Sequence, residues 1–171
     1  IVNDVRALRG EGALEAVASA GVAVCLMHMR GTPATMQSAP EYRDVVAEVR
    51  DFLVSRARAC EAAGIARDRI VVDPGFGFGK TQAHNLDLLA GLTAIAAAGY
   101  PVLAGLSRKS MLGAITGRPG SGRTAASVAG ALLAVERGAS IVRVHDVRET
   151  VDALAVWRAL DERERERGRT E

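Results

Sequence analysis

Polar residues stand out at the points where short apolar segments of this chain end. Asp73 closes the apolar run Ile70–Asp73, and a carboxylate in such a place needs hydrogen-bond donors or a cation as its partner. Pro74 and three alternating glycines follow, so this loop can bring its backbone close to a ligand. We therefore expect Asp73 to bind donors on the edge of a ligand, with a helix or loop cap as the alternative.

A basic run, Ser107–Ser110, precedes a short helical stretch at Met111–Ile115. Backbone N–H groups at a helix start favour anions, and the Ser110 hydroxyl and the nearby cations add to that preference. A carboxylate or a phosphate would fit such a site. Ordinary N-capping of the helix by Ser107 is the alternative.

Arg143 and His145 alternate with valines in the apolar segment Ile141–Val147, which predicts that both side chains point to one face of a strand. An arginine on the inner face of a buried strand needs a counter-charge, and a bound anion would supply it. The planar guanidinium also matches phosphate oxygens well. This pair therefore predicts an anion site.

One glycine-rich motif carries less weight. Gly79, Lys80 and Thr81 resemble the end of a phosphate-binding P-loop, but Pro74 stands where that motif requires a glycine. Lys80 and Lys109 are the only two lysines among the 22 basic residues, which makes their positions in the fold informative.

Composition limits the functional classes. The chain has 171 residues, 49% hydrophobic and 25% charged, with a formal net charge of +2. This balance suits one globular domain and argues against a nucleic-acid partner that needs a basic face. No apolar run reaches the roughly 18 residues of a membrane span, and no basic-then-apolar leader is present. Cys25 and Cys60 suit neither a disulfide scaffold nor a zinc site, so we expect packing roles in a cytoplasmic protein without a membrane partner.

The elements that must position these residues alternate between strands and helices. Helical periodicity is clearest from Glu41 to Ala63 and recurs at about 85–98, 124–138 and after Asp146, where Asp146 and Glu149 form a capping pattern. Near-continuous apolar runs predict strands at Ile1–Val5, Val22–Met29, Ile70–Asp73, Val102–Leu106 and Ile141–Val147. The alternation predicts a parallel α/β fold whose strands end at a common active-site edge.

Five segments, in chain order, resemble motifs of the dihydropteroate synthase family of pterin-binding enzymes. They are Ile1–Val5, Leu26–Gln37, Asp73–Thr81, Gly105–Ser110 and Arg143–Val147. The resemblance implies a (β/α)₈ TIM barrel, of which this chain matches strands four to eight as five parallel βα units, so the barrel is expected to be incomplete. It also implies a single pterin-binding domain over 1–171. The alternating Glu and Arg residues of 161–171 themselves indicate a charged, solvated tail.

The resemblance further implies an activity and a set of site residues. The family condenses 6-hydroxymethyl-7,8-dihydropterin diphosphate with p-aminobenzoate and releases 7,8-dihydropteroate and pyrophosphate. By similarity, the pterin contacts are Asn3, Met27, Asp73, Gly105, Lys109 and Arg143, and the p-aminobenzoate contacts are Phe78 and Ser110. Arg143 and His145 would bind the diphosphate, and these two residues together with Lys109 are expected to be catalytic.

The family motifs of the first three barrel strands have no counterpart in this sequence. Because the family's Mg²⁺ ligand belongs to that part, we expect Mg²⁺ as cofactor, no metal ligand in this chain, and poor activity of the 171 residues alone. Small-molecule substrates and a homodimer of the complete protein are also implied. The alternatives are a pterin-binding methyltransferase domain and a non-catalytic fragment or partner subunit.

Overall fold

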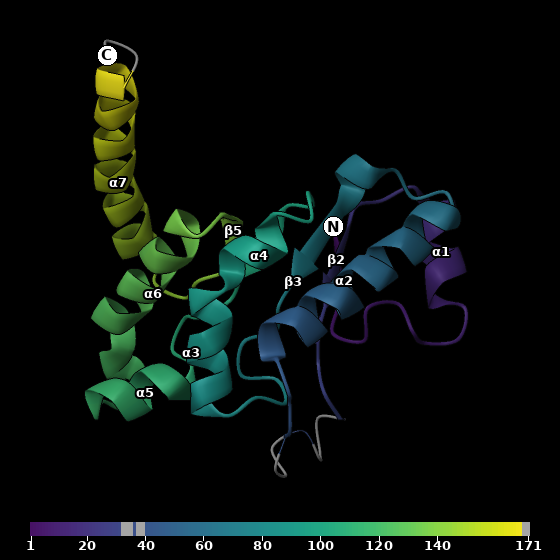
Figure 1. Cartoon of the computed structure of the whole chain (residues 1–171), viewed down its shortest axis with the longest axis horizontal. Helices are drawn as coiled ribbons and strands as arrows, with labels where there is room; N and C mark the ends of the chain where they lie inside the picture. Colours follow the sequence, from purple (N-terminus) through teal and green to yellow (C-terminus); the bar gives the residue numbers. More distant parts are fainter. Residues whose placement is uncertain (32–35, 37–39, 169–171) are drawn as a thin grey trace.

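Five parallel strands form one sheet, hydrogen-bonded in chain order from β1 to β5 (Figure 1). The strands are β1 Val2–Asp4, β2 Val24–Met27, β3 Ile70–Asp73, β4 Val102–Ala104 and β5 Ala139–Val142. The computed structural model describes residues 1–31, 36 and 40–168. Residues 32–35, 37–39 and 169–171 lie outside that description, among them part of the motif Leu26–Gln37 and the end of the expected charged tail.

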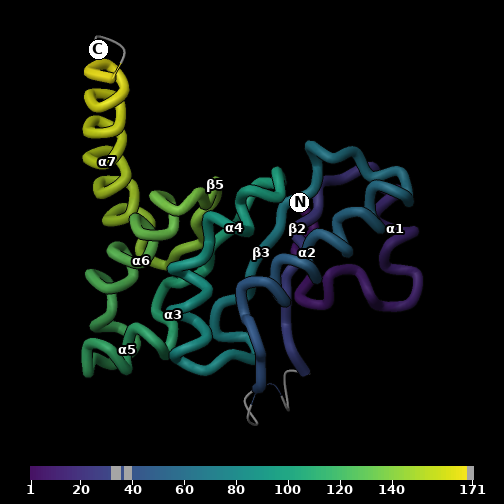
Figure 2. The backbone as a smooth tube through the Cα atoms, in the orientation of Figure 1, coloured from purple at the N-terminus to yellow at the C-terminus, as the bar shows by residue number. Residues whose placement is uncertain are grey.

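Helices connect the strands in an unbroken alternation. They are α1 Ala13–Ala20, α2 Val45–Ala62, α3 Gln82–Ala90, α4 Leu92–Ala96, α5 Ser110–Thr116, α6 Thr124–Glu136 and α7 Val147–Gly168. Because the strand order never reverses, successive right-handed crossovers place their helices on the same face of the sheet. Helix α2, for example, lies across β2 and β3 in the backbone trace and contacts both (Figure 2). The predicted parallel α/β fold is confirmed.

The two faces of the sheet bury different sets of side chains. On the face covered by helices, Leu26 and Val72 belong to the main hydrophobic core. On the opposite face, Cys25, Val71 and Leu103 form a smaller cluster, so Cys25 has the packing role that the sequence predicted. Neighbouring residues along a strand point to opposite faces, which explains this division.

The second face also carries the predicted site. Asn3 lies opposite Cys25 in register, and Met27 lies opposite Asp73. Partners in register point to the same side of a sheet, and Asp73 stands two residues beyond Val71 on β3. Asn3, Met27 and Asp73 therefore face away from the helices, toward the side that the interior of a barrel would occupy.

Two helix boundaries differ from those predicted. The helix expected from Glu41 begins at Val45, because the Asp44 carboxylate caps it by accepting from the Ala47 N–H at 3.0 Å. The helix expected at about 85–98 is divided into α3 and α4 at Gly91. A Cβ at Gly91 would lie 2.7 Å from the Val46 side chain. Because glycine has no Cβ, the backbone at this break can approach α2 closely.

Helix α7 projects from the body of the molecule (Figure 1). Residues 161–168 of the expected charged tail continue this helix, and Arg165 forms an ion pair with Asp161 at 2.9 Å. The tail is therefore helical and largely exposed as far as the structure describes it. Among the described helices, none combines the length and apolar character that crossing a membrane requires.

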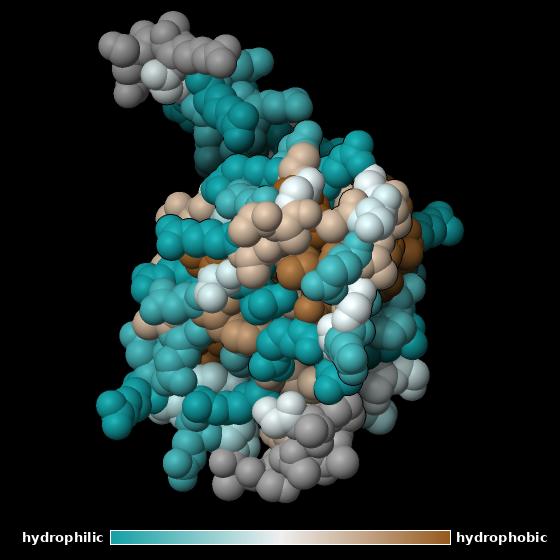
Figure 3. Space-filling view, turned by 90° about the vertical axis from the view of Figure 1, so that its right-hand side faces the viewer, coloured by the Kyte–Doolittle hydropathy of each residue, from teal (hydrophilic) through white to brown (hydrophobic). Residues whose placement is uncertain are grey.

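Apolar side chains reach the surface at both edges of the sheet. Ile1 and Val2 are exposed at β1, and Ile141 is exposed on β5. The side of the molecule that carries α1 shows apolar surface between polar side chains (Figure 3). Edge strands of this kind offer unpaired backbone groups and favour association with further strands.

Candidate active site

A charged network links three strand ends. The Arg143 guanidinium, which follows β5, donates to the Asp73 carboxylate at 3.0 Å and to the Asn3 side-chain oxygen at 3.1 Å. Asp73 ends β3 and Asn3 lies in β1, so the network spans the edge of the sheet. We expected a bound anion to be the counter-charge of Arg143. The structure shows that the Asp73 carboxylate supplies one counter-charge from within the protein, while the Arg143 side chain stays 46% exposed.

Asp73 is almost fully buried, and both of its oxygens have partners. One oxygen accepts from the Gly75 N–H at 2.8 Å, which is the loop cap considered as the alternative role, and the other accepts from Arg143. Burial raises the pKa of the Asp73 carboxyl, while Gly75 and Arg143 act in the opposite direction. A ligand that donates to this carboxylate must therefore share it with Arg143 or take its place.

Phe78 and Lys109 meet beside this network. The Lys109 ammonium lies 4.3 Å from the centre of the Phe78 ring, a cation–π contact between the loops that follow β4 and β3. Burial lowers the pKa of Lys109, an effect that the negative charge of Asp73 opposes. An aromatic ligand at this point would meet a ring and a cation together.

Arg108 fixes the loop that presents Lys109. Its φ of 57° is uncommon for a residue with a side chain, and surrounding contacts hold it there. The guanidinium donates twice to Asp146, at 3.2 and 2.6 Å, and the Arg108 N–H donates to the Ser127 hydroxyl at 2.9 Å. The capping pattern expected of Asp146 and Glu149 is corrected, because the Asp146 carboxylate engages Arg108 instead.

His145 is held by Ser107. The His145 N–H donates to the Ser107 hydroxyl at 3.1 Å, and the ring Nδ1 lies 2.9 Å from the same oxygen. Ser107 consequently does not cap α5, whose N-cap position is Lys109 without a side-chain cap. Sequence reasoning missed this role of Ser107, because it depends on a contact across 38 positions of the chain.

The last strand is shorter than predicted. Strand β5 ends at Val142, although the Arg143 N–H still donates to the Ala104 carbonyl at 3.0 Å. Arg143 and His145 thus lie in the loop after the strand and not on one face within it. The predicted alternation up to Val147 is wrong, because beyond Arg143 the backbone bonds to a side chain in place of a neighbouring strand.

A cavity of about 300 Å³ brings most of these groups together. Its lining consists of Phe78, Gly105, Ser107, Lys109, Arg143, Val144 and His145. Met27 is 1% exposed beneath the edge, and Ser110 is an exposed first residue of α5 outside this lining. Within the described residues, no three His, Cys, Asp or Glu side chains stand close enough together to hold a metal ion.

A larger hollow of about 700 Å³ lies on the other side of the β2 and β3 loops. Arg30, Tyr42 and Glu48 contribute to its lining, but none of the predicted site residues does. The chemistry-bearing groups converge on the smaller cavity, and we therefore place the candidate active site there despite the difference in size.

Lys80 is 3% exposed and lines neither of these two spaces. Its ammonium donates to the carbonyl oxygens of Gly75 and Phe78 in its own loop, at 2.9 and 3.1 Å. These contacts remove the P-loop interpretation, because a P-loop lysine must reach the phosphates of its ligand.

The chain matches a known protein family and is similar in sequence to known proteins. A family described as pterin binding enzyme matches residues 1–145. A dihydropteroate synthase from Neisseria meningitidis serogroup C is 55% identical over 163 residues, which cover 94% of this chain and 58% of that protein. The chain therefore spans somewhat more than half the length of this relative.

Two solved structures are similar in fold as well as in sequence. Dihydropteroate synthase from Yersinia pestis, solved as a sulfonamide drug complex, superimposes with a TM-score of 0.91 at 47% identity. The matched region covers 94% of this chain and 58% of the Yersinia pestis chain. Dihydropteroate synthase from Xanthomonas albilineans, solved with 7,8-dihydropteroate, has a TM-score of 0.87 at 56% identity. The matched region covers 93% of this chain and 58% of the Xanthomonas albilineans chain.

Proposed function

Because this chain belongs to the pterin-binding enzyme family, we propose that it is the C-terminal part of a dihydropteroate synthase of folate biosynthesis. The reaction joins 6-hydroxymethyl-7,8-dihydropterin diphosphate to p-aminobenzoate and yields 7,8-dihydropteroate and pyrophosphate. The observation that carries this proposal is the meeting of the Asp73–Arg143–Asn3 network with the Phe78–Lys109 pair at one sheet edge.

The pterin is proposed to bind at the buried carboxylate. Its amino group and ring N–H present adjacent donors, which the two oxygens of Asp73 can accept as a pair. Asn3 offers both a donor and an acceptor, and Met27 closes the apolar floor. Gly105 leaves room for the ligand and for Arg143, since a Cβ there would lie 2.8 Å from a guanidinium nitrogen.

The diphosphate is proposed to face Arg143 and His145. When the bond from the methylene carbon to the diphosphate oxygen breaks, the electron pair leaves with pyrophosphate, and a cation at Arg143 stabilises that charge. The aminobenzoate nitrogen then bonds to the methylene carbon and loses a proton. Lys109 and Phe78 would orient the aminobenzoate ring, and Ser110 would hold its carboxylate. The scheme does not require a general base among these residues.

A direct test follows pyrophosphate release by the protein at full length. Release that requires both the pterin diphosphate and p-aminobenzoate supports the synthase, whereas release without p-aminobenzoate contradicts it. We expect the 171 residues alone to turn over poorly and to associate through the open edges of β1 and β5. Full turnover by a monomer of this chain would overturn the partial-barrel interpretation.

The two alternatives predict different results in the same assay. A pterin-binding methyltransferase domain would release no pyrophosphate from the diphosphate substrate, and a non-catalytic partner subunit would show no turnover in the protein at full length. The relatives and solved structures named above are synthases, which favours the first proposal.

Three further properties are proposed from the family resemblance. A Mg²⁺ requirement is tested by measuring turnover after adding a chelator and again after restoring Mg²⁺. A homodimer is tested by light scattering on the protein at full length, and a cytoplasmic location by cell fractionation.

A further inference from the structure

One buried lysine, Lys80, bridges the backbone of the loop that carries Phe78. Lys80 is 3% exposed, and its ammonium donates to the carbonyls of Gly75 and Phe78 at the two ends of the turn. The same nitrogen lies 3.0 Å from Nδ1 of His28, which follows β2. Lys80 therefore cannot touch a substrate in the cavity, but it contacts the backbone of a residue that lines it.

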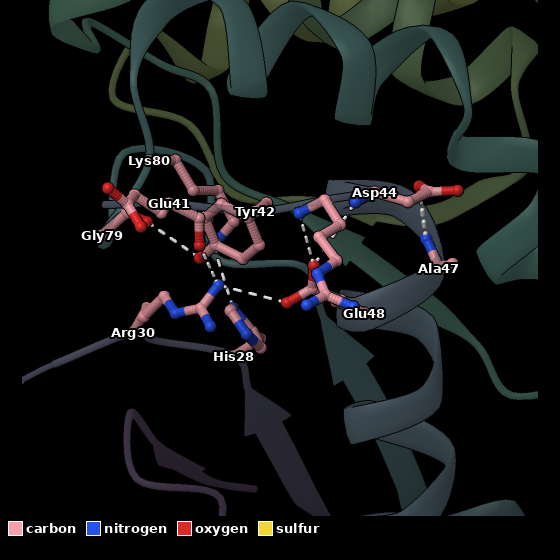
Figure 4. Close-up of polar contacts among 10 residues, drawn as sticks. His28, Arg30, Glu41, Tyr42, Asp44, Ala47, Glu48, Gly79 and Lys80 are labelled. Carbon is pink, nitrogen blue, oxygen red and sulfur yellow. Dashed lines mark hydrogen bonds and ion pairs between the residues drawn. The ribbon is translucent and has the colours of Figure 1, made fainter. Parts of the chain in front are cut away.

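Two glycines bring the β2 and β3 loops into close backbone contact. A Cβ at Gly75 would lie 2.0 Å from the His28 carbonyl oxygen, and a Cβ at Gly79 would lie 2.4 Å from that of Arg30. The Tyr42 hydroxyl, at the start of the segment leading to α2, donates to the Gly79 carbonyl at 2.8 Å (Figure 4). The β3 loop is thus held against the β2 loop at both Gly75 and Gly79, and Lys80 lies between the two loops.

The remaining polar group of the turn is also satisfied. The Asn85 side chain in α3 accepts from the Gly77 N–H at 2.7 Å and donates to the Thr81 carbonyl at 2.6 Å. The backbone on both sides of Phe78 is therefore bonded to groups that lie outside the cavity. The Phe78 ring faces Lys109, whose side chain also passes close to Gly77.

The burial of Lys80 suits a structural donor, because an amine that is 3% exposed does not reach a substrate in the cavity. Burial lowers its pKa to about 7, and the negative charge of Asp73 acts in the opposite direction. An apolar side chain of similar length would avoid the cost of burying an amine, but it would leave the Gly75 and Phe78 carbonyls without their donor. The consequence of losing Lys80 is consequently a change in the shape of the turn.

We propose that Lys80 is a positioning residue that sets the place of the Phe78 ring, and with it the p-aminobenzoate half of the site, through the Gly75 and Phe78 carbonyls. The pterin half depends on Asp73, Asn3 and Arg143, and the hydrogen bonds of Lys80 go to other residues. The negative charge of Asp73 acts on the Lys80 ammonium from a distance, where it opposes the lowering of its pKa by burial. This inference rests on the proposed function, because it concerns one of the two proposed substrates.

The test measures both KM values in the protein at full length. Lys80→Met is expected to raise the KM for p-aminobenzoate about tenfold and to change the KM for the pterin diphosphate less than twofold. Combining Lys80→Met with Phe78→Leu should raise the p-aminobenzoate KM little beyond Phe78→Leu alone, because both changes act on one ring. Equal increases in the two KM values, or additive effects in the double variant, would contradict the proposal.

A matched control is available at the opposite end of the strands. Arg67 donates to the Ala98 and Gly99 carbonyls at 3.1 and 3.2 Å and lies over the Tyr100 ring, so it also holds a turn through backbone carbonyls. Arg67→Met is expected to lower the unfolding midpoint without changing either KM. A selective effect of Arg67→Met on the p-aminobenzoate KM would also count against a specific role for Lys80.

Lys80→Gln keeps the experiment informative if Lys80→Met fails to fold. Its amide retains a donor but no charge, and the p-aminobenzoate KM should rise at least threefold while the pterin KM stays unchanged. An unchanged p-aminobenzoate KM in a folded variant overturns the positioning role. Absence of pyrophosphate release by the unmodified protein would instead refute the proposed function, so the two failures are distinguishable.

Discussion

The two halves of the site edge are built on different physical terms. In the loops after β2 and β3, the polar groups of His28 and Lys80 are buried and paired within the protein, as is that of Asn85 in α3. In the loops after β4 and β5, polar side chains are accessible: the Arg143 side chain is 46% exposed, and His145 is exposed as well. One half is a buried scaffold, and the other carries accessible polar side chains.

This difference separates positioning from binding. A buried hydrogen bond cannot be exchanged for water without leaving a polar group unpaired, so the β2–β3 half keeps its shape before any ligand arrives. The Arg143 side chain is 46% exposed, so the β4–β5 half can turn its charge toward a ligand when donors of that ligand take its place at the buried Asp73 carboxylate. Substitutions in the first half should therefore alter stability or geometry, and those in the second should alter turnover.

The largest effect is expected at the buried contact between the two loops. Gly75→Ala places a methyl group on the His28 carbonyl and should lower the free energy of unfolding by about 3 kcal/mol or more. Gly117 has the same φ of 68°, but a Cβ there would meet nothing within 4 Å, so Gly117→Ala should lower it by only about 1 to 2 kcal/mol. Urea unfolding of both variants measures the difference, and equal losses would show that backbone strain alone matters.

The accessible half is tested through turnover. Lys109→Ala should lower kcat more than tenfold while leaving the unfolding midpoint nearly unchanged, because Lys109 acts on charge at a ligand. Arg143→Met should lower kcat by a similar factor and the unfolding midpoint as well, because it also removes the counter-charge of the buried Asp73 carboxylate. Arg158→Met, on the exposed surface of α7, serves as the control and should leave kcat unchanged. Turnover near that of the unmodified protein would remove Arg143 and Lys109 from the site.

His28 makes the buried half sensitive to acid. Burial and the nearby Lys80 lower the pKa of His28 from 6.5 to about 3. Between these values the unfolded chain binds a proton that the folded protein does not, so this contribution to stability is complete above pH 6.5 and is lost as the pH falls. The loss approaches about 1.4 kcal/mol per pH unit.

The comparison with His28→Gln isolates this group. The glutamine variant keeps a hydrogen-bond acceptor for Lys80 but does not itself titrate. Urea unfolding at pH 7, 6 and 5 should show the unmodified protein losing more stability than the variant. Parallel pH profiles for the two proteins would mean that His28 is not buried in its neutral form.

The smallest effect is expected next to Lys80 but at the surface. The Thr81 hydroxyl caps α3 by accepting from the His84 N–H at 3.1 Å. In return, Nδ1 of the His84 ring accepts from the Thr81 N–H at 3.3 Å. Thr81→Ala should lower the free energy of unfolding by about 0.5 to 1 kcal/mol, and Thr81→Ser should restore it. A loss as large as that of Gly75→Ala would show that position in the loop, and not burial, decides the cost.

The charged ends of the strands could be predicted from the sequence, but their partners could not. Asp73, Arg143 and His145 each follow an apolar run, and parallel strands bring such positions to one edge. That Arg143 pairs with Asp73 depends on residues 70 positions apart, and that Ser107 holds His145 depends on a loop after β4. The helix predicted from Glu41 begins later, at Val45, for a local reason, because the Asp44 side chain caps it.

Apolar runs alternate with helical periodicity along the chain, and this pattern alone predicts the parallel α/β fold and offers the residues after those runs as candidates for chemistry. The contacts of Lys80, in contrast, follow from the folded chain. In the sequence this lysine follows a glycine-rich loop, as a phosphate-binding lysine would, and its contacts with His28 and the Phe78 carbonyl appear only when two loops pack together. Burial changes the chemistry of an amine, and burial is a property of the folded chain.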